Sequence, residues 1–292
     1  MNSANPNIRG SSQVSAHRFR KYLRTPKAVV LIVLVLMTLL ASLGRHHLHG
    51  LTNALFAVLT AIIVDGAVGL FYRPRRLFSD GGVITALIVA DILSTTSPWY
   101  ASVIVTAIAL ASKHLLKNKR KPVFNPAAFG LLLSTLLFST GQSWWGSLAL
   151  LPWWTIALLI VGGFVVTQKV NKFPQVYAFL ATYFILLLVM ALLHLGLPSD
   201  TPADALRVPF VNSALFLAFF MLTDPPTSPA QYKHQIYFGI FAATISILIF
   251  ATKGGLAYLY IGLLTANLWK VWISRRAAES RARSASSMRT SQ

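Results

Sequence analysis

The chain has 292 residues, of which 55% are hydrophobic and only 11% are charged. A soluble protein of this length needs more charge to cover its surface, so the composition is typical of a membrane protein with several spans. Cysteine is absent, which excludes disulfides, thiolate zinc sites and cysteine-bound iron–sulfur clusters within the chain. No spacing of ligand-type residues predicts a metal site.

Ten apolar runs approach the roughly 20 residues needed to cross a bilayer. We therefore expect an all-α integral membrane protein with about ten transmembrane helices in a domain at 28–274. Basic tails, 1–27 and 275–292, flank this domain, and we expect both to be disordered. The predicted spans are 28–44, 50–72, 82–97, 99–116, 123–140, 149–168, 175–195, 209–224, 235–252 and 255–273.

The loops between these runs alternate in charge. "YRPRR", "KHLLKNKRK" and "TQKVNK" are basic, whereas "STTSPWY", "STGQSWWGS" and "TKGG" contain few or no Lys and Arg. We expect the chain to lie in the cell membrane, where the positive-inside rule places both termini in the cytoplasm. Termini on the same side require an even number of spans. This pattern explains the net charge of +19 better than nucleic acid binding does. The tryptophan pairs Trp144–Trp145 and Trp153–Trp154 fit an aromatic belt at the membrane surface.

Two short segments indicate an internal repeat. "TALIVADILSTTSP" in the third run and "SALFLAFFMLTDPPTSP" in the eighth lie five runs and about 130 residues apart, as in transporter-like folds built from two inverted halves. Five is an odd number, so the halves, about 28–140 and 149–273, should face opposite ways across the bilayer. In such folds the functional site lies near the interface between the halves.

The end of the eighth run, "LTDPPTSP", combines a carboxylate with residues that cannot continue a helix. Thr223 and Asp224 stand at this break. Non-helical backbone at membrane depth is tolerated where it is buried in protein or lines a polar cavity. One interpretation is a contact with a cofactor, an ion or a substrate. The other is an interfacial helix stop that Asp224 caps.

Further polar residues lie in or beside apolar runs. Asn125 before Pro126 fits a helix cap, which would explain the pair fully, although a buried amide could also bind a flavin or quinone ring. Asp91 lies about two turns before the "TTSP" break, and an ionisable group at that depth usually faces a cavity or a partner. Asp65 fits a simpler role, pairing with a nearby basic or backbone group.

Four stretches, taken in order, resemble the NqrB/RnfD membrane subunits. They are "SDGGVITALIVADILSTTSPWY", "KPVFNPAAFGLLLSTLLF", "FMLTDPPTSPA" and "GGLAYLYIGLLTAN". These subunits belong to the sodium-pumping NADH:quinone oxidoreductase and to the Rnf ferredoxin:NAD oxidoreductase. The similarity extends from about residue 28 to 275, and the family fold it implies is ten helices in two inverted halves.

The resemblance implies electron transfer through flavin held in the membrane. In the family a covalent FMN is attached to a threonine between the fifth and sixth spans, but here that region is "STGQSWWGSLALLP", where only Thr140 is available and the expected context is absent. We therefore expect a flavin, FMN or riboflavin, that is bound without a covalent bond. The residues that carry over as candidate cofactor ligands are Asn125, Phe129, Thr223, Asp224, Asp91 and Thr95.

Two functions from different classes follow. In the first, the chain is a membrane redox subunit that passes electrons within the bilayer. It needs other redox subunits or an electron-carrier protein as partners, because it contains no NADH domain and no iron–sulfur ligands. In the second, the same scaffold is a transporter or channel for a small solute such as a flavin, with Asp91 and Asp224 lining the path. A purely structural subunit is a third alternative.

Overall fold

The computed structural model describes residues 20–44, 48–72, 80–119, 121–195, 207–255 and 257–290, and within them helices occupy all ten predicted apolar runs. In chain order they are α2 (Pro26–Gly44), α3 (Leu48–Tyr72), α4 (Asp80–Ile92), α5 (Trp99–Leu115), α6 (Pro126–Phe138), α7 (Ile156–Val170), α8 (Phe173–Leu192), α9 (Val208–Phe216), α10 (Tyr232–Lys253) and α11 (Tyr258–Thr290). Short helical turns η1 (Trp145–Ser147), η2 (Trp153–Thr155) and η4 (Leu217–Leu222), and an antiparallel pair of strands, β1 (Lys117–Asn118) and β2 (Lys121–Pro122), complete the described elements.

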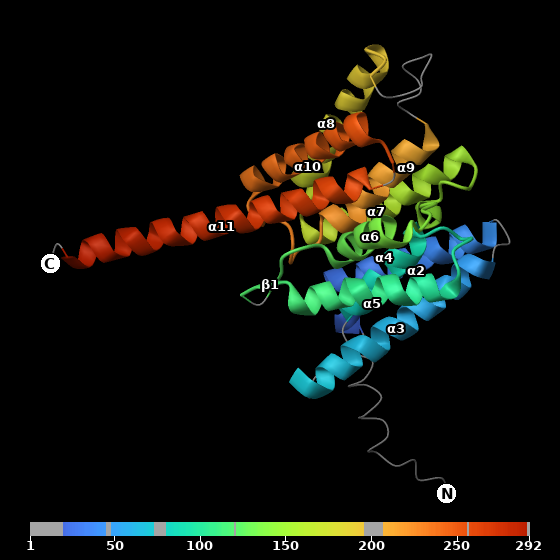
Figure 1. The fold of residues 1–292 in the computed structure, drawn as a ribbon, viewed down its shortest axis with the longest axis horizontal. Coiled ribbons are helices and arrows are strands. Elements are labelled where there is room, and N and C mark those ends of the chain that lie inside the picture. Colours follow the sequence, from blue (N-terminus) through green and yellow to red (C-terminus); the bar gives the residue numbers. More distant parts are fainter. Residues whose placement is uncertain are drawn as a thin grey trace, which may run out of the picture.

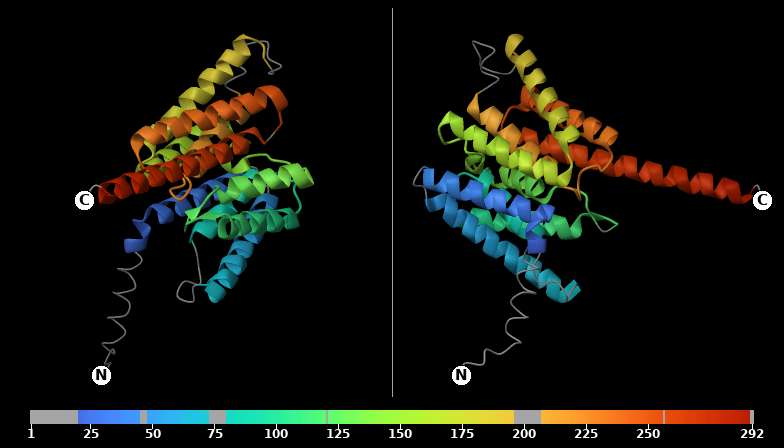
Figure 2. Two further views of the ribbon diagram at one scale, coloured as in Figure 1. Left: turned by 60° about the vertical axis from the view of Figure 1, so that its left-hand side comes forward. Right: turned by 180° about the vertical axis from the view of Figure 1, so that it is seen from behind.

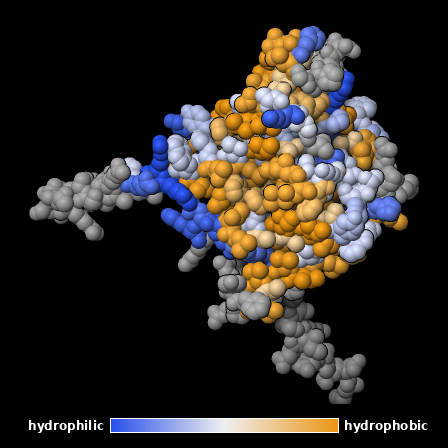
Figure 3. Space-filling view, viewed as in Figure 1, coloured by the Kyte–Doolittle hydropathy of each residue, from blue (hydrophilic) through white to orange (hydrophobic). Residues whose placement is uncertain are grey.

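The surface of the helical bundle is apolar and suits a lipid environment. Large side chains such as Leu43, Ile63 and Val161 are exposed around it, and apolar residues form a broad band in Figure 3. Five segments are long and apolar enough to cross a membrane, namely Pro26–Gly44, Leu48–Leu70, Trp153–Val170, Phe173–Leu192 and Tyr232–Lys253. The expectation of an all-α membrane protein is therefore confirmed, whereas ten crossings remain a prediction.

The first and second parts of the chain form two adjacent groups of helices. The blue and green helices α2 to α5 lie together, and the yellow to red helices α8 to α11 lie beside them (Figures 1 and 2). Glycines allow helices to approach closely in both groups: a Cβ on Gly130 of α6 would lie 2.8 Å from the Val105 carbonyl of α5, and one on Gly262 of α11 would lie 2.5 Å from the Ala242 carbonyl of α10.

Helix α4 ends at Ile92, five residues before the predicted end of its span, and its last carbonyls are satisfied by the segment after α6. The Ile92 carbonyl accepts hydrogen bonds from the backbone N–H groups of Ser143 (3.0 Å) and Trp144 (3.2 Å), and the Ala90 carbonyl accepts one from Trp145 Nε1 (2.7 Å). Backbone groups freed at a break inside a membrane need such partners.

This contact corrects one prediction about the tryptophans. Trp144 and Trp145 are 8% and 3% exposed, and Trp144 stacks on Tyr260 with 5.7 Å between ring centroids, so they belong to the core rather than to an aromatic belt. Their burial follows from the segment folding back onto α4. Trp153 and Trp154 are 79% and 58% exposed, as a belt requires.

Helix α11 differs from the expected disorder of the C-terminal tail. It continues to Thr290 and projects beyond the neighbouring helices (Figure 2). The segment from 275 onward, "RRAAESRARSASSMRT", contains no Gly or Pro, and its Ala and Arg residues favour helix. Nothing therefore ends the helix at the membrane boundary. Most of the N-terminal tail, 1–19, lies outside the described residues.

Candidate functional site

Asn125 connects three parts of the structure through its amide and backbone. Its Oδ1 accepts a hydrogen bond from the Ala128 N–H (3.1 Å), so it caps α6, with Pro126 as the first helical residue. Its Nδ2 donates to the Met221 carbonyl at the end of η4 (3.0 Å), and its own N–H donates to Asn267 Oδ1 of α11 (2.9 Å). The predicted cap is confirmed, and the same side chain also ties α6 to the broken helix.

The proline-rich segment after η4 is held by donors from other helices. Asn267 Nδ2 donates to the Thr227 carbonyl (3.1 Å), and Lys270 Nζ donates to the Pro226 carbonyl (2.7 Å). Lys172, between α7 and α8, donates to the Pro229 carbonyl. The segment between η4 and α10 is not helical, so these carbonyls receive no helical backbone hydrogen bonds, and the side chains fix the segment instead.

A cavity of about 420 Å³ opens beside this segment, within the size range of small-molecule sites. Three of the predicted cofactor ligands, Asn125, Thr223 and Asp224, line it. The lining also includes apolar side chains, two residues at helix starts and three lysines: Val30, Ile84, Ile88, Phe220, Pro26, Gly81, Lys27, Lys113 and Lys121. We call this space the basic-end cavity.

Asp224 is the acidic group of the basic-end cavity, and it lies two residues beyond the apolar segment Val208–Leu222. Burial raises the pKa of its carboxyl above the usual range, while a hydrogen bond from Thr227 Oγ1 (2.8 Å) opposes the rise. The ammonium groups of Lys270, Lys113 and Lys27 also oppose it. The carboxyl is therefore half-buried at the cavity, and nearby cations partly compensate for its loss of solvent.

Lys172 gives this region a testable pH dependence. Burial lowers the pKa of its amine to about 8, and the nearby Lys270 and Lys121 add to this effect, although Asp224 acts against it. An unfolded lysine titrates near 10.4, so between about pH 8 and pH 10.4 the unfolded chain binds a proton that the folded chain does not. The contribution of Lys172 to the free energy of unfolding therefore increases with pH across this window. Below about pH 8 this contribution does not change with pH.

We expect Lys172→Gln to remove that rise. The apparent Tm of detergent-solubilised protein is measured by tryptophan fluorescence from pH 7 to 10. The quantity compared is the difference in Tm between variant and wild type at each pH. Lys169→Gln, an exposed position three residues away, is the control and should keep the wild-type slope. Parallel profiles for wild type and Lys172→Gln would contradict the assignment.

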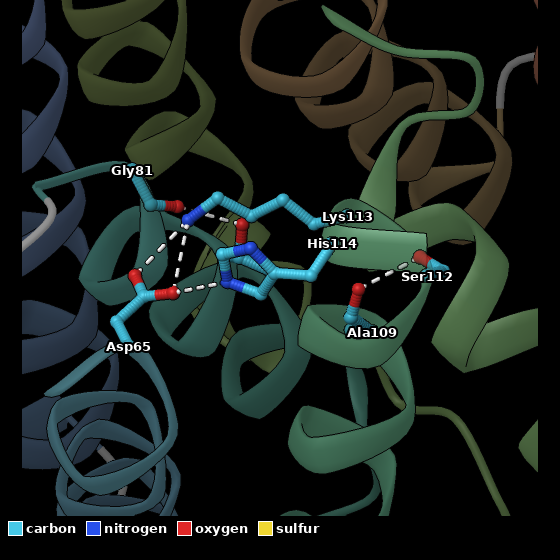
Figure 4. A network of polar contacts seen from close by, with 7 residues as sticks. Asp65, Gly81, Ala109, Ser112, Lys113 and His114 are labelled. Carbon is cyan, nitrogen blue, oxygen red and sulfur yellow. Dashed lines mark hydrogen bonds and ion pairs between the residues drawn. The ribbon is translucent and has the colours of Figure 1, made fainter. Parts of the chain in front are cut away.

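A second polar cluster lies at the wall of the basic-end cavity (Figure 4). Asp65 of α3, with only 4% of its side chain exposed, accepts from Lys113 Nζ (3.0 Å to Oδ2), and its Oδ1 lies 2.7 Å from Nε2 of His114. Both partners are on the last turn of α5. Gly82 of α4 leaves room for the carboxylate, because a Cβ there would lie 2.1 Å from Asp65 Oδ2.

The sequence predicts pairing for Asp65 but does not single out Lys113 and His114. The alternation of the loop charges could have identified these two partners. Asp65 falls near the end of the second predicted span and Lys113 near the end of the fourth, and both of these ends adjoin basic loops. Residues at matching depth on the same side of a membrane are candidates for contact.

The remaining predicted ligands lie elsewhere. Asp91 is fully buried and accepts from Thr38 Oγ1 at 2.9 and 3.2 Å, close to the other break. Thr95 lies beyond the end of α4. Phe129 stacks on Phe124, with 5.5 Å between ring centroids, and neither of these rings is among the cavity-lining residues. The structure thus brings together Asn125, Thr223 and Asp224 only.

Comparisons with known proteins point to one family. The model of the NQR2, RnfD, RnfE family matches residues 142–280. Similar proteins include the D subunit of the ion-translocating oxidoreductase complex from Pseudomonas paraeruginosa (strain DSM 24068 / PA7), 24% identical over 80% of this chain and 84% of the relative. The proteins of the same name from Pseudomonas aeruginosa (strain LESB58) and Colwellia psychrerythraea (strain 34H) are each 23% identical, over 75% and 80% of this chain and 80% and 86% of the relatives.

These relatives are named as D subunits of an ion-translocating oxidoreductase complex, and the apolar helices described above support a membrane location for this chain. The matches extend over both groups of helices, although identity is low. The family model covers the segment after α6, the proline-rich break and most of α11. Residues 142–280 of the chain are therefore similar to the NQR2, RnfD, RnfE family.

Proposed function

We propose that this chain is the membrane subunit of an RnfD-like ion-translocating oxidoreductase complex and that it holds a flavin without a covalent bond in the basic-end cavity. The observation that carries the proposal is the convergence of Asn125, Thr223 and Asp224 on one cavity. Its partners are other redox subunits or an electron-carrier protein, and the basic loops suit docking of an acidic partner. A bound flavin would supply electron transfer within the bilayer.

The residues of the cavity fit such a ring. Ile84, Ile88 and Phe220 offer apolar surface for the ring faces. The Asp224 carboxyl can accept a hydrogen bond from a ring N–H, and lysines beside the cavity favour the negative charge that reduction adds. Asn125 acts differently from the prediction, because its amide is already engaged by Ala128 and Met221. We therefore place Asn125 in the wall of the cavity and assign it no direct contact with the flavin ring.

The same proposal includes two inverted halves with both termini in the cytoplasm. Equivalent contacts support it. Gly130 meets Ala109 where α6 crosses α5, and Gly262 meets Ala242 where α11 crosses α10; these two pairs are separated by about 130 residues, as inverted repeats require. Helix α4 and the α9–η4 segment both break before a Pro-containing stretch. Covalent attachment of the flavin is not part of the proposal. Thr140 Oγ1 donates to Ser134 Oγ (2.8 Å), and the sequence around Thr140 does not resemble the attachment segment of the family.

The test is the visible absorption of the purified protein before and after acid precipitation. We expect a flavin spectrum that moves into the supernatant on precipitation, and Asp224→Asn should lower the flavin content while membrane insertion persists. The control variant Glu279→Gln, which removes an exposed carboxylate from α11, should keep the wild-type flavin content. A colourless wild-type preparation from flavin-replete cells would contradict the redox function and favour a solute transporter.

A further inference from the structure

A second cavity adjoins the proline-rich segment where this segment meets α10 and α11. Its volume is about 210 Å³, and it shares Lys121 and Pro225 with the basic-end cavity. The rest of its lining comes from residues in 228–231, the first turn of α10 and the stretch 269–274 of α11. Asp224 does not line this second space, which we call the small cavity.

The small cavity is rich in hydrogen-bond donors and positive charge. Lys121 and Lys270 bring two ammonium groups, and the described lining contains no Asp or Glu. Lys270 Nζ donates to the Pro226 carbonyl (2.7 Å), which uses one of the three N–H donors of an ammonium group. Within the described part of the chain, no carboxylate forms an ion pair with either lysine. Both ammonium groups therefore keep donors for a ligand.

Charges around the small cavity do not cancel this excess. Burial, together with the nearby Lys270 and Lys121, lowers the pKa of the Lys172 amine to about 8. Among the described groups that act on Lys172, Asp224 is the only carboxylate, so three lysines share a single acidic group. Lys172 also donates to the Pro229 carbonyl in the cavity lining. A bound anion would relieve the repulsion among these lysines.

The N-terminus of α10 lies at the same cavity. Gln231, its N-cap, and His234, in its first turn, both line the space, and the Gln231 side chain makes no capping hydrogen bond. The first N–H groups of a helix have no partner within it and carry partial positive charge. Donors thus converge from β2, α10 and α11. A phosphate group matches them, because it is negatively charged and its oxygens accept several hydrogen bonds.

The size and position of the small cavity restrict its ligand. Sites that enclose a whole drug-sized molecule measure about 300–1,000 Å³, so a volume of about 210 Å³ suits one charged group. On the same stretch of α11, the Arg276 guanidinium lies 3.9 Å from the centroid of the Trp272 ring, and Trp and Arg near the end of an apolar run are typical of a membrane–water interface. Basic pockets between helices at such an interface bind anionic lipid headgroups.

We propose that the small cavity binds a phosphate group beside Lys121, Lys270 and the N-terminus of α10. The phosphate belongs either to the headgroup of an anionic phospholipid or to a soluble phosphate, since both present the same chemistry to these donors. The inference does not depend on a flavin in the basic-end cavity.

The lipid source is tested in nanodiscs that contain phosphatidylglycerol and phosphatidylcholine in equal amounts. Native mass spectrometry of the released protein measures which lipid stays bound. We expect roughly tenfold enrichment of phosphatidylglycerol, as about one charge-assisted contact implies. Lys121→Gln combined with Lys270→Gln should abolish the enrichment. Lys121→Gln alone, at an exposed position, leaves the Lys270 contact with Pro226 in place and should reduce the enrichment.

The matched control combines Lys27→Gln with Lys233→Gln. It removes the same charge from two exposed lysines that do not line the small cavity, and one of them, Lys27, lines the basic-end cavity. The control should keep the enrichment, which separates the small cavity from its neighbour and from the general charge of the surface.

The soluble source is tested with inorganic phosphate and protein in phosphatidylcholine nanodiscs. A rise in Tm over chloride at equal ionic strength, lost when Lys121 and Lys270 are both replaced, would assign the site to a soluble phosphate if no lipid is enriched. Enrichment of phosphatidylglycerol that depends on the same lysines would assign it to a headgroup. Absence of both responses would overturn the proposal, as would enrichment that survives in the double variant or disappears in the control.

Discussion

Replacing Asn125 with alanine should destabilise the protein and empty the flavin site together. The substitution removes the cap on α6, which costs about 0.5–2 kcal/mol. It also removes the shorter of two hydrogen bonds to the Met221 carbonyl, which keeps the Asp224 N–H at 3.4 Å, and the loss of one such bond costs about 0.5–1.5 kcal/mol. The two losses share one side chain, so we expect a combined effect of roughly 1–3 kcal/mol. Thermal unfolding followed by tryptophan fluorescence measures the first effect, and bound flavin per protein measures the second.

Asn125→Asp separates the two contacts of this side chain. Aspartate keeps an acceptor for the Ala128 N–H but has no donor for the Met221 carbonyl, so its Tm should fall between those of wild type and Asn125→Ala. Flavin content should follow the same order, because the wall of the cavity depends on the contact with η4. A wild-type Tm in Asn125→Ala would show that the side chain does not connect α6 to the broken helix.

The second large effect is expected at Asp65. Its carboxylate lies between α3, α4 and α5 and neutralises Lys113. Breaking a buried ion pair by removing one partner costs about 3–5 kcal/mol. Lys113 and His114 have 19% and 22% of their side chains exposed, and solvent reduces the cost, so we expect roughly 2–3 kcal/mol for Asp65→Ala.

Gly82→Ala tests the same cluster without removing any charge. Its Cβ would lie 2.1 Å from Asp65 Oδ2, so α4 or the carboxylate must shift, at a cost of about 1–3 kcal/mol. Lys117→Ala, an exposed position just beyond α5, is the control and should change Tm little. Both cluster variants should also lower flavin content, because Lys113 lines the basic-end cavity. Unchanged stability in Asp65→Ala would mean that the cluster is not a structural connection.

The helices could be predicted because a bilayer constrains the sequence strongly. Long apolar runs are needed to satisfy the backbone within lipid, and an Asn before a Pro is sufficient to start α6. The break after η4 was also predictable, since the prolines of "TDPP" cannot continue a helix, whereas α4 ends at Ile92, before "TTSP" begins. These features are determined by residues that lie close together in the sequence.

The partners of the breaks could not be predicted in the same way. Trp145 donates to the Ala90 carbonyl across 55 positions, and the Asn125 N–H donates to Asn267 across 142. Such contacts depend on how the helices pack, which local pattern does not encode. For the same reason Asp91 and Asp224, which the sequence groups as one interior, belong to different breaks in the structure.

Photolabelling with an azidoflavin tests the location of the proposed site most directly. Protein labelled in the membrane, digested and analysed by mass spectrometry should carry the label within 121–127 or 223–226, and excess unmodified flavin should suppress it. Labelling confined to 93–98 or 139–148, at the other break, would contradict the account, as would labelling that unmodified flavin does not displace.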